Sequence, residues 1–99
     1  MSEKNLVVRT LRILNVLKGK TLSGLSNTEI AAATKIPAPT VTRILAVMVE
    51  ENFAMQLDNG RYALSVRMLG IAQSHANEIE RSQTKISELS HRVQAASRQ

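Results

Sequence analysis

The sequence predicts a mainly α-helical fold with one small β-hairpin, followed by a long C-terminal helix. Through the first fifty residues, apolar side chains recur at spacings of three and four, which is the period of amphipathic helices. An Asn-Gly pair at positions 59–60 separates two short stretches that can form strands, and this pair is a strong hairpin signal. Beyond residue 65, apolar residues recur every seven positions, as in a long helix.

The composition indicates one small domain with an extension. The chain has 99 residues, of which 43% are hydrophobic, and only Phe53 and Tyr62 are aromatic, so the core must be aliphatic. The formal net charge of +5 favours an acidic partner such as nucleic acid, although the same charge can simply keep a small protein soluble. There is no cysteine, which excludes a disulfide framework, a thiolate zinc site and a cysteine nucleophile.

No apolar run approaches the roughly 20 residues that cross a bilayer, so no membrane partner is expected. The N-terminus also lacks a signal-peptide cleavage pattern. We therefore expect an unprocessed, cytoplasmic protein.

The first expected helix covers residues 5–18. Six apolar residues gather on one side of this helix and are expected to face the core: Leu6, Val7, Leu11, Ile13, Leu14 and Leu17. Val8 and Val16 lie on the opposite, polar side. Their position is either chance or the mark of a contact with a partner subunit.

A short second helix is expected over residues 27–34. Ser26-Asn27-Thr28-Glu29 matches a capping box at its start. The segment 35–37 should end it, because the residue before a proline is disfavoured in the helical conformation. A helix, a short turn and a second helix with alanines at the crossing are typical of a helix-turn-helix. The connector 21–25 before this pair can hold one or two residues of strand.

The third helix, residues 39–51, is the expected recognition helix. Its inward face is predicted to hold Val41, Ile44, Leu45, Met48 and Val49, and its outward face Pro39, Thr40, Thr42, Arg43 and Ala46. The outward face is small and rich in hydroxyls, so it can press against base-pair edges. Its acidic residues stand at the far end, which leaves the positive pole of the helix dipole free to face phosphates. An ordinary amphipathic helix would show the same two faces, so the neighbouring elements decide between the readings.

The hairpin is expected from strands 53–57 and 61–64, joined by Asp58-Asn59-Gly60. A hairpin directly after a recognition helix is a wing, so residues 1–70 are predicted to form a winged helix-turn-helix domain. Arg61 near the tip has the charge to touch a phosphate or enter the minor groove. It can equally be a solvated turn residue.

Residues 71–99 are expected to form a helical extension, in a helix that begins near Ser65. Ala72, Ile79, Ile86 and Val93 recur every seven residues, beside a weaker register of Met68, His75, Ser82, Leu89 and Ala96. A domain of about 65 residues cannot bury such a helix. The helix therefore either pairs with its copy in a homodimer or frays at its end.

In this order, the motifs resemble the N-terminal winged helix-turn-helix domain of IclR-type transcriptional regulators. Residues 9–14 resemble the family's "RALRIL", residues 28–31 its "TEIA", residues 36–45 its "LPKSTVSRLL", residues 59–64 its "GRYRLG" wing, and residues 67–70 the start of its linker helix. The resemblance covers about residues 5–75.

The resemblance implies a dimeric DNA-binding transcription factor. By position, Thr40, Thr42 and Arg43 take the recognition contacts and Arg61 the wing contact, while Ala38 and Pro39 stand where the family carries Lys and Ser. The family's first helix commonly contributes to the dimer. Family members also carry an effector-binding domain of well over a hundred residues, whereas this chain stops at position 99. It is therefore either a fragment or a stand-alone module, and we expect no small-molecule effector and no cofactor.

The leading hypothesis is a sequence-specific regulator that binds double-stranded DNA as a homodimer. The expected DNA contacts are Lys35, Ala38, Pro39, Thr40, Thr42, Arg43, Asn59 and Arg61, and the expected dimer contacts are Val8, Val16, Ala72, Ile79, Ile86 and Val93. Phosphate contacts would come from Lys4, Arg9, Lys18, Lys20, Lys35 and Arg67.

The alternative is a protein-interaction adaptor that uses the winged helix and the C-terminal helix as docking surfaces. An enzyme is not expected. His75 and His91 lie sixteen residues apart on one helix and cannot meet within a monomer, and there is no metal-ligand cluster and no glycine-rich phosphate loop.

Overall fold

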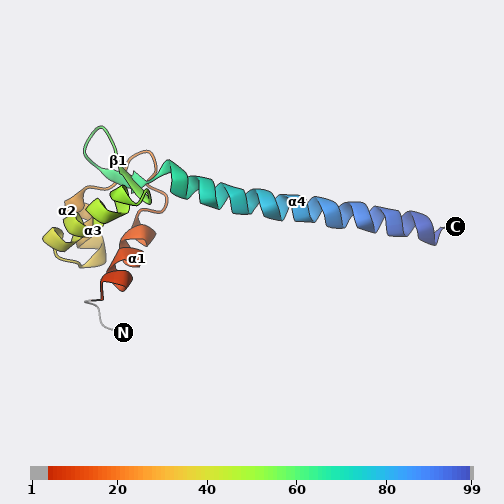
Figure 1. The fold of residues 1–99 in the computed structure, drawn as a ribbon, viewed down its shortest axis with the longest axis horizontal. Coiled ribbons are helices and arrows are strands. Elements are labelled where there is room, and N and C mark those ends of the chain that lie inside the picture. Colours follow the sequence, from red (N-terminus) through yellow and green to blue (C-terminus); the bar gives the residue numbers. More distant parts are fainter. Residues whose placement is uncertain (1–4, 99) are drawn as a thin grey trace. The chain divides into compact units, whose positions relative to one another are not determined.

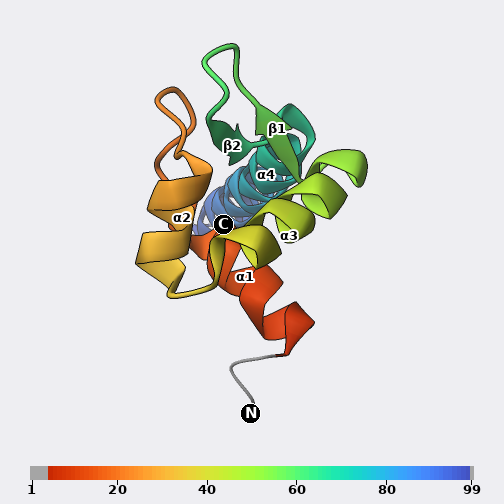
Figure 2. The ribbon, with the colours of Figure 1, turned by 90° about the vertical axis from the view of Figure 1, so that its left-hand side faces the viewer.

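The computed structural model describes residues 5–98 and confirms the predicted fold class. Its elements are α1 (Leu6–Val16), α2 (Asn27–Thr34), α3 (Ala38–Glu50), β1 (Ala54–Gln56), β2 (Tyr62–Leu64) and α4 (Val66–Ser97) (Figure 1). They fall into two compact units, a first unit that ends at Leu69 and a second unit that begins at Gly70. The first unit holds the three short helices and the hairpin (Figure 2).

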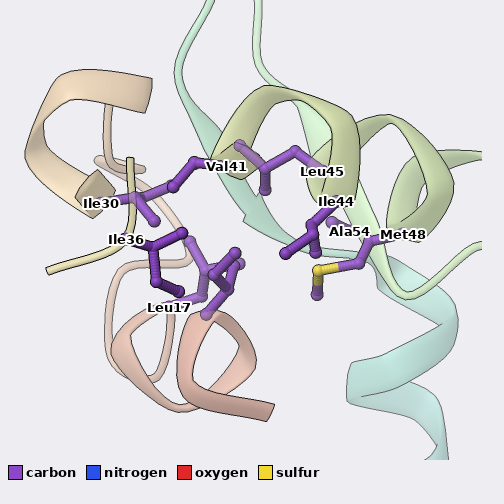
Figure 3. Close-up of a cluster of buried hydrophobic side chains, with 9 residues drawn as sticks. Leu17, Ile30, Ile36, Val41, Ile44, Leu45, Met48 and Ala54 are labelled. Carbon is purple, nitrogen blue, oxygen red and sulfur yellow. The ribbon is translucent and has the colours of Figure 1, made fainter. Parts of the chain in front are cut away.

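The core of the first unit is aliphatic, as the composition predicts. Its buried residues come from α1, α2, α3, β1 and the turn before α3: Ile13, Leu17, Ile30, Ile36, Val41, Ile44, Leu45, Met48 and Ala54 (Figure 3). Tyr62 packs against this cluster only in part, and Phe53 is exposed. Hydrophobic burial by branched aliphatic side chains therefore holds the three helices together.

Helix α1 packs on the core with its C-terminal half only. Asn5 caps its start, since the Asn5 Oδ1 accepts hydrogen bonds from the backbone N–H groups of Val7 and Val8 at 2.9 and 3.2 Å. Three residues expected in the core are exposed instead: Leu6, Val7 and Leu11. Conversely, Val16 was expected on the outer side and packs against the core. The prediction was wrong here because the N-terminal half of α1 meets α3 only at an open hollow, whereas Ile13 and the residues after it pack in the core.

The turn between α2 and α3 is built as the sequence predicts, with one addition. The capping box forms, with the Glu29 N–H bonded to the Ser26 hydroxyl and the Ser26 N–H bonded to the Glu29 carboxylate. Lys35 ends α2 in the left-handed conformation, with φ of 59°. Ile36 is then buried, and Pro37 precedes the first residue of α3. The left-handed residue reverses the chain so that α3 can cross α2.

The wing is a two-stranded antiparallel hairpin that the connector extends. Ala54 pairs with Leu64, Met55 with Ala63 and Gln56 with Tyr62. Leu25 adds a bridge through two hydrogen bonds of 2.8 Å with the Tyr62 backbone. The strands are shorter than expected, since Phe53, Leu57 and Arg61 lie outside them.

In that turn only one residue takes a positive φ. The Gly60 N–H donates to the Leu57 carbonyl at 2.8 Å, and the Leu57 N–H donates to the Arg61 carbonyl at 2.7 Å. Gly60 has a φ of 85°, whereas Asn59 keeps an ordinary negative value. This is the pattern of a type I turn closed by a glycine bulge.

Ser65 joins the end of α3 to the beginning of α4. Helix α3 closes at Asn52, which has a φ of 65°. The buried Ser65 hydroxyl donates to the Asn52 carbonyl at 2.5 Å and accepts from the Met68 N–H at 3.0 Å. Ser65 is thus the cap of α4 and not its first residue.

The second unit consists of α4 from Gly70 onward. All of its described side chains are exposed, including the apolar ones. Within residues 5–98, no helix combines the length and the hydropathy that a membrane crossing needs.

Candidate nucleic-acid interface

Helix α3 presents a small, uncharged first turn and one arginine. Ala38, Pro39, Thr42 and Arg43 are exposed, and no acidic residue lies in the first turn of the helix. The positive pole of the helix dipole is therefore uncompensated by a carboxylate at this end. Because the side chains of Ala38 and Pro39 are short, another surface can come close to the backbone here.

Thr40 lies on the other side of α3, so its predicted outward position is wrong. It is 8% exposed, and its hydroxyl oxygen is 3.4 Å from the Nη2 of Arg43, which donates to it. The sequence did contain the signal, because Thr40 precedes the buried Ile44 by four residues and so shares its face. Thr40 positions Arg43 and is not available as a contact of its own.

Thr42 is held by a residue that the sequence analysis did not select. The Asn27 side chain, at the first position of α2, donates a hydrogen bond to the Thr42 Oγ1. The Thr42 hydroxyl in turn donates to the Ala38 carbonyl at 3.1 Å. The start of α2 and the exposed face of α3 therefore meet at one polar contact.

Arg43 keeps most of its hydrogen-bonding capacity. A guanidinium has five N–H donors in a planar fork. The bond to Thr40, at 3.4 Å, is long and occupies only one of them. The exposed fork can therefore make a two-point contact with a planar acceptor pair.

Arg61 points back into the protein and not outward from the wing. Its guanidinium forms an ion pair with Glu29, and its Nε and Nη2 donate to the carbonyls of Ser23 at 3.1 Å and Gly24 at 3.3 Å. In the chain without DNA the Arg61 side chain is thus engaged within the protein, and its wing contact stays a prediction. Arg61 fastens the wing to the connector and to the start of α2.

The same contacts hold Glu29 in its ionised form. The hydrogen bond from the Ser26 backbone N–H is the largest cause that lowers the pKa of Glu29, and the Ser26 side chain and Arg61 add to it. Partial desolvation opposes these effects without cancelling them. The carboxylate therefore joins a helix cap and an ion pair at one point.

Gly24 allows the connector to lie directly against the wing. Its φ is +66°, and a Cβ at this position would stand 2.9 Å from the Leu57 side chain and 3.0 Å from the Tyr62 carbonyl oxygen. No side chain fits without a shift of the hairpin. Sequence reasoning treated Gly24 as an ordinary connector residue, although its neighbourhood requires glycine.

Asn59 and Lys35 are both exposed and lie in different parts of the first unit. The Asn59 side chain accepts from the Arg61 N–H at 2.9 Å and so shapes the turn. Lys35 borders a hollow of about 430 Å³ next to Arg9 and Arg12. The expected phosphate contacts Lys18, Lys20 and Arg67 are exposed, and Lys4 lies outside the described residues.

The expected dimer residues are not equally available. Val16 is partly buried against the core, so less of its side chain is available for a dimer contact. Val8 is half-buried at an apolar hollow that Leu11, Leu14, Leu64 and Met68 also line. Ala72, Ile79, Ile86 and Val93 are exposed along α4.

Comparison with known proteins agrees with this geometry. The model of the IclR helix-turn-helix domain matches residues 6–58, from the start of α1 to the turn of the wing. A crystal structure of an IclR family transcriptional regulator from Brucella abortus is similar, with 28% sequence identity and a TM-score of 0.60. The similarity covers 70% of this chain and 26% of that one. No curated protein matches the sequence. Since the matched segment is more than half of the chain, the protein belongs to the IclR helix-turn-helix domain family.

Proposed function

We propose that the protein is a transcription regulator that binds double-stranded DNA in a sequence-specific manner. The observation that carries this proposal is the exposed face of α3, where Thr42 and Arg43 stand beside a first turn without acidic side chains. Membership of the IclR helix-turn-helix family supports it, as does the similarity to a protein described as a transcriptional regulator.

In this proposal the N-terminal half of α3 enters the major groove. Arg43 donates two hydrogen bonds to the O6 and N7 of a guanine, which is the commonest specific protein–DNA contact. Ala38 and Pro39 let the backbone approach, and Thr42 reads a neighbouring base. The hairpin lies over the adjacent backbone, with the exposed Asn59 near its tip.

Phosphate contacts supply the remaining affinity. Residues 5–69 carry twice as many lysines and arginines as aspartates and glutamates. Lys35, Arg9 and Arg12 border one hollow between α1 and the end of α2, and they are candidates for such contacts. Since bound phosphates release counterions, binding should weaken steeply as salt increases.

We further propose that the regulator is a homodimer joined through the second unit. The single chain exposes to water an apolar stripe, which consists of Ala72, Ile79, Ile86 and Val93. Pairing with a second copy would bury this stripe. A dimer would bring two recognition helices to two half-sites.

The test is selection of bound sequences from a random pool of duplexes. The intact chain, Arg43→Ala and the matched control Arg98→Ala would be compared at the same salt concentration. We expect the intact chain and Arg98→Ala to enrich the same sequence, and Arg43→Ala to lose the preference at one base. Equal, unselective retention of all three proteins would mean general charge attraction and would overturn the proposal.

A protein-interaction adaptor is the second candidate, because α1 exposes apolar side chains. Leu6, Val7 and Leu11 are all more than half exposed, and Leu6 borders an apolar hollow with Val47 of α3. Binding to a protein partner that is insensitive to salt, without retention on DNA, would favour this function.

A further inference from the structure

The second unit carries one apolar register and one weaker, half-polar register, and no other part of the described chain covers them. Ala72, Ile79, Ile86 and Val93 form the first register, and His75, Ser82, Leu89 and Ala96 follow it by three residues. Their exposure is high, with Ile86 at 68% and Leu89 at 55%. Two such registers over four heptads are typical of a coiled coil. A helix of this length gains most of its stability from packing, so the stripe needs an occupant.

We propose that the occupant is the second unit of another copy, and that the two helices run antiparallel. This inference rests on the homodimer proposed above and assigns its orientation. In the antiparallel alignment that overlaps the whole second unit, each core layer holds one residue of the first register and one residue of the partner's second register. Ala72 then packs against the partner's Ala96, and Ile79 packs against the partner's Leu89. Ser82 then meets the partner's Ile86, and His75 meets the partner's Val93.

The residues in the core layers do not by themselves decide between a parallel and an antiparallel pair. A parallel pair would stack each residue on its own copy, which matches Ile79 with Ile79 but also His75 with His75. The antiparallel pair places each polar residue beside an aliphatic one and the two small alanines together. The charged residues beside the stripe decide between the two arrangements.

Glu78, Lys85 and Arg92 flank the stripe one position before the first register. In the antiparallel pair Glu78 faces the partner's Arg92, and two-fold symmetry forms this ion pair twice. Lys85 meets its own copy at the centre, where its long side chain can extend into water. In a parallel pair the same three residues face Gln83, Ser90 and Ser97, which are uncharged. Charge complementarity therefore favours the antiparallel pair.

The orientation also separates the two basic winged domains. The two domains are attached at opposite ends of the helix pair. Their positive charges therefore repel each other less than they would if both domains were attached at the same end. Gly70 to Ser97 spans about 40 Å at 1.5 Å per residue. This is close to the roughly 34 Å that separates half-sites one helical turn apart on DNA.

The first test uses disulfide cross-linking, which is clean because the natural chain has no cysteine. Full-length Ala72→Cys and Ala96→Cys would be oxidised separately and as an equilibrated mixture, with Asn77→Cys on the outer face as the control. We expect a covalent dimer from the mixture, at least tenfold above either variant alone or the control. Equally efficient cross-linking of Ala72→Cys alone would show a parallel pair. No cross-link in any sample would show that the stripe is not paired in this way. Either result overturns the proposal.

The second test is a charge-reversal cycle on the full chain, read as the dimer dissociation constant by sedimentation. Glu78→Arg and Arg92→Glu should each weaken the dimer about tenfold, and the double variant should recover most of the loss. Each substitution also repels a neighbour in its own helix, Arg81 or Glu88, and the double variant keeps both effects. Recovery can therefore come only from contact across the pair, and its absence would refute the antiparallel register.

Selection of DNA sequences by the same preparations separates the two proposals. Selective DNA binding without the expected cross-link would defeat only the antiparallel pair. The expected cross-link without selective DNA binding would defeat only the proposed function.

Discussion

The two units of this chain use the same kind of helix pattern with opposite results. In the first unit, α3 buries Val41, Leu45 and Met48 in a shared core. In the second unit, α4 presents Ile79, Ile86 and Val93 at similar regularity and buries none of them. The comparison teaches that periodicity predicts a helix with an apolar face, whereas burial depends on whether other elements of the chain reach that face.

The largest expected effect compares one leucine from each unit. Leu45 is fully buried, so Leu45→Ala should lower the free energy of unfolding of the first unit by about 3 kcal/mol, through lost burial and a cavity. Leu89→Ala, on the exposed stripe, should leave that free energy unchanged. Urea unfolding followed by circular dichroism, at a concentration where the chain is monomeric, measures both. Equal losses would show that Leu89 stabilises the first unit as much as Leu45 does, and would contradict the comparison.

The next effect compares two glycines that both have positive φ. At Gly24 an added Cβ would collide with the wing, whereas at Gly60 it would meet nothing within 4 Å. Gly24→Ala should therefore cost about 2 kcal/mol, and Gly60→Ala about 1 kcal/mol from backbone strain alone. Thermal unfolding of the two variants gives the difference. If Gly60→Ala costs as much as Gly24→Ala, the close packing of the connector on the wing does not contribute.

A smaller effect tests the link between α3 and the start of α4, within the first unit. Ser65→Ala removes the cap of α4 and leaves the Asn52 carbonyl without its side-chain donor, so it should cost about 1 kcal/mol. Ser97→Ala removes a serine hydrogen bond at the exposed end of the same helix and should cost almost nothing. Chemical unfolding of both variants checks this. A negligible loss for Ser65→Ala would mean that α4 begins without help from α3.

The smallest effect is a pH dependence within the first unit. Folding lowers the pKa of Glu29, so its contribution is complete above the ordinary carboxyl pKa and is lost as pH falls through the folded value. The stability difference between the natural chain and Glu29→Gln should therefore be positive at neutral pH and should shrink on acidification below about pH 4.5. Unfolding curves at several pH values measure it. A difference that grows on acidification would contradict the sign, and Glu88→Gln in the second unit serves as the control.

Sequence reasoning succeeded where a signal is local. The capping box at Ser26 and Glu29, the proline before α3 and the glycine in the wing turn all act through neighbouring residues, and each is found in place. The aliphatic core followed from the near absence of aromatic residues. These features depend on short stretches of chain and hardly on the rest of the fold.

It failed where the answer depends on distant elements. Leu6, Val7 and Leu11 belong to an apolar face that the other elements leave more than half exposed. Arg61 stands near a turn in sequence, but its side chain returns to a connector nearly forty residues earlier. Only the packed arrangement of α1, α2 and the wing decides these positions.

The contact between Asn27 and Thr42 has a consequence for which bases α3 can distinguish. The single proton of the Thr42 hydroxyl is used by the Ala38 carbonyl, and one of its lone pairs is used by the Asn27 amide. A further partner can therefore only be a donor. In the major groove the base edges that donate are the amino groups of adenine and cytosine. If α3 reads DNA as proposed, Asn27 would in this way limit the hydrogen bonds of the Thr42 hydroxyl to those two bases, while the Thr42 methyl group stays able to contact thymine.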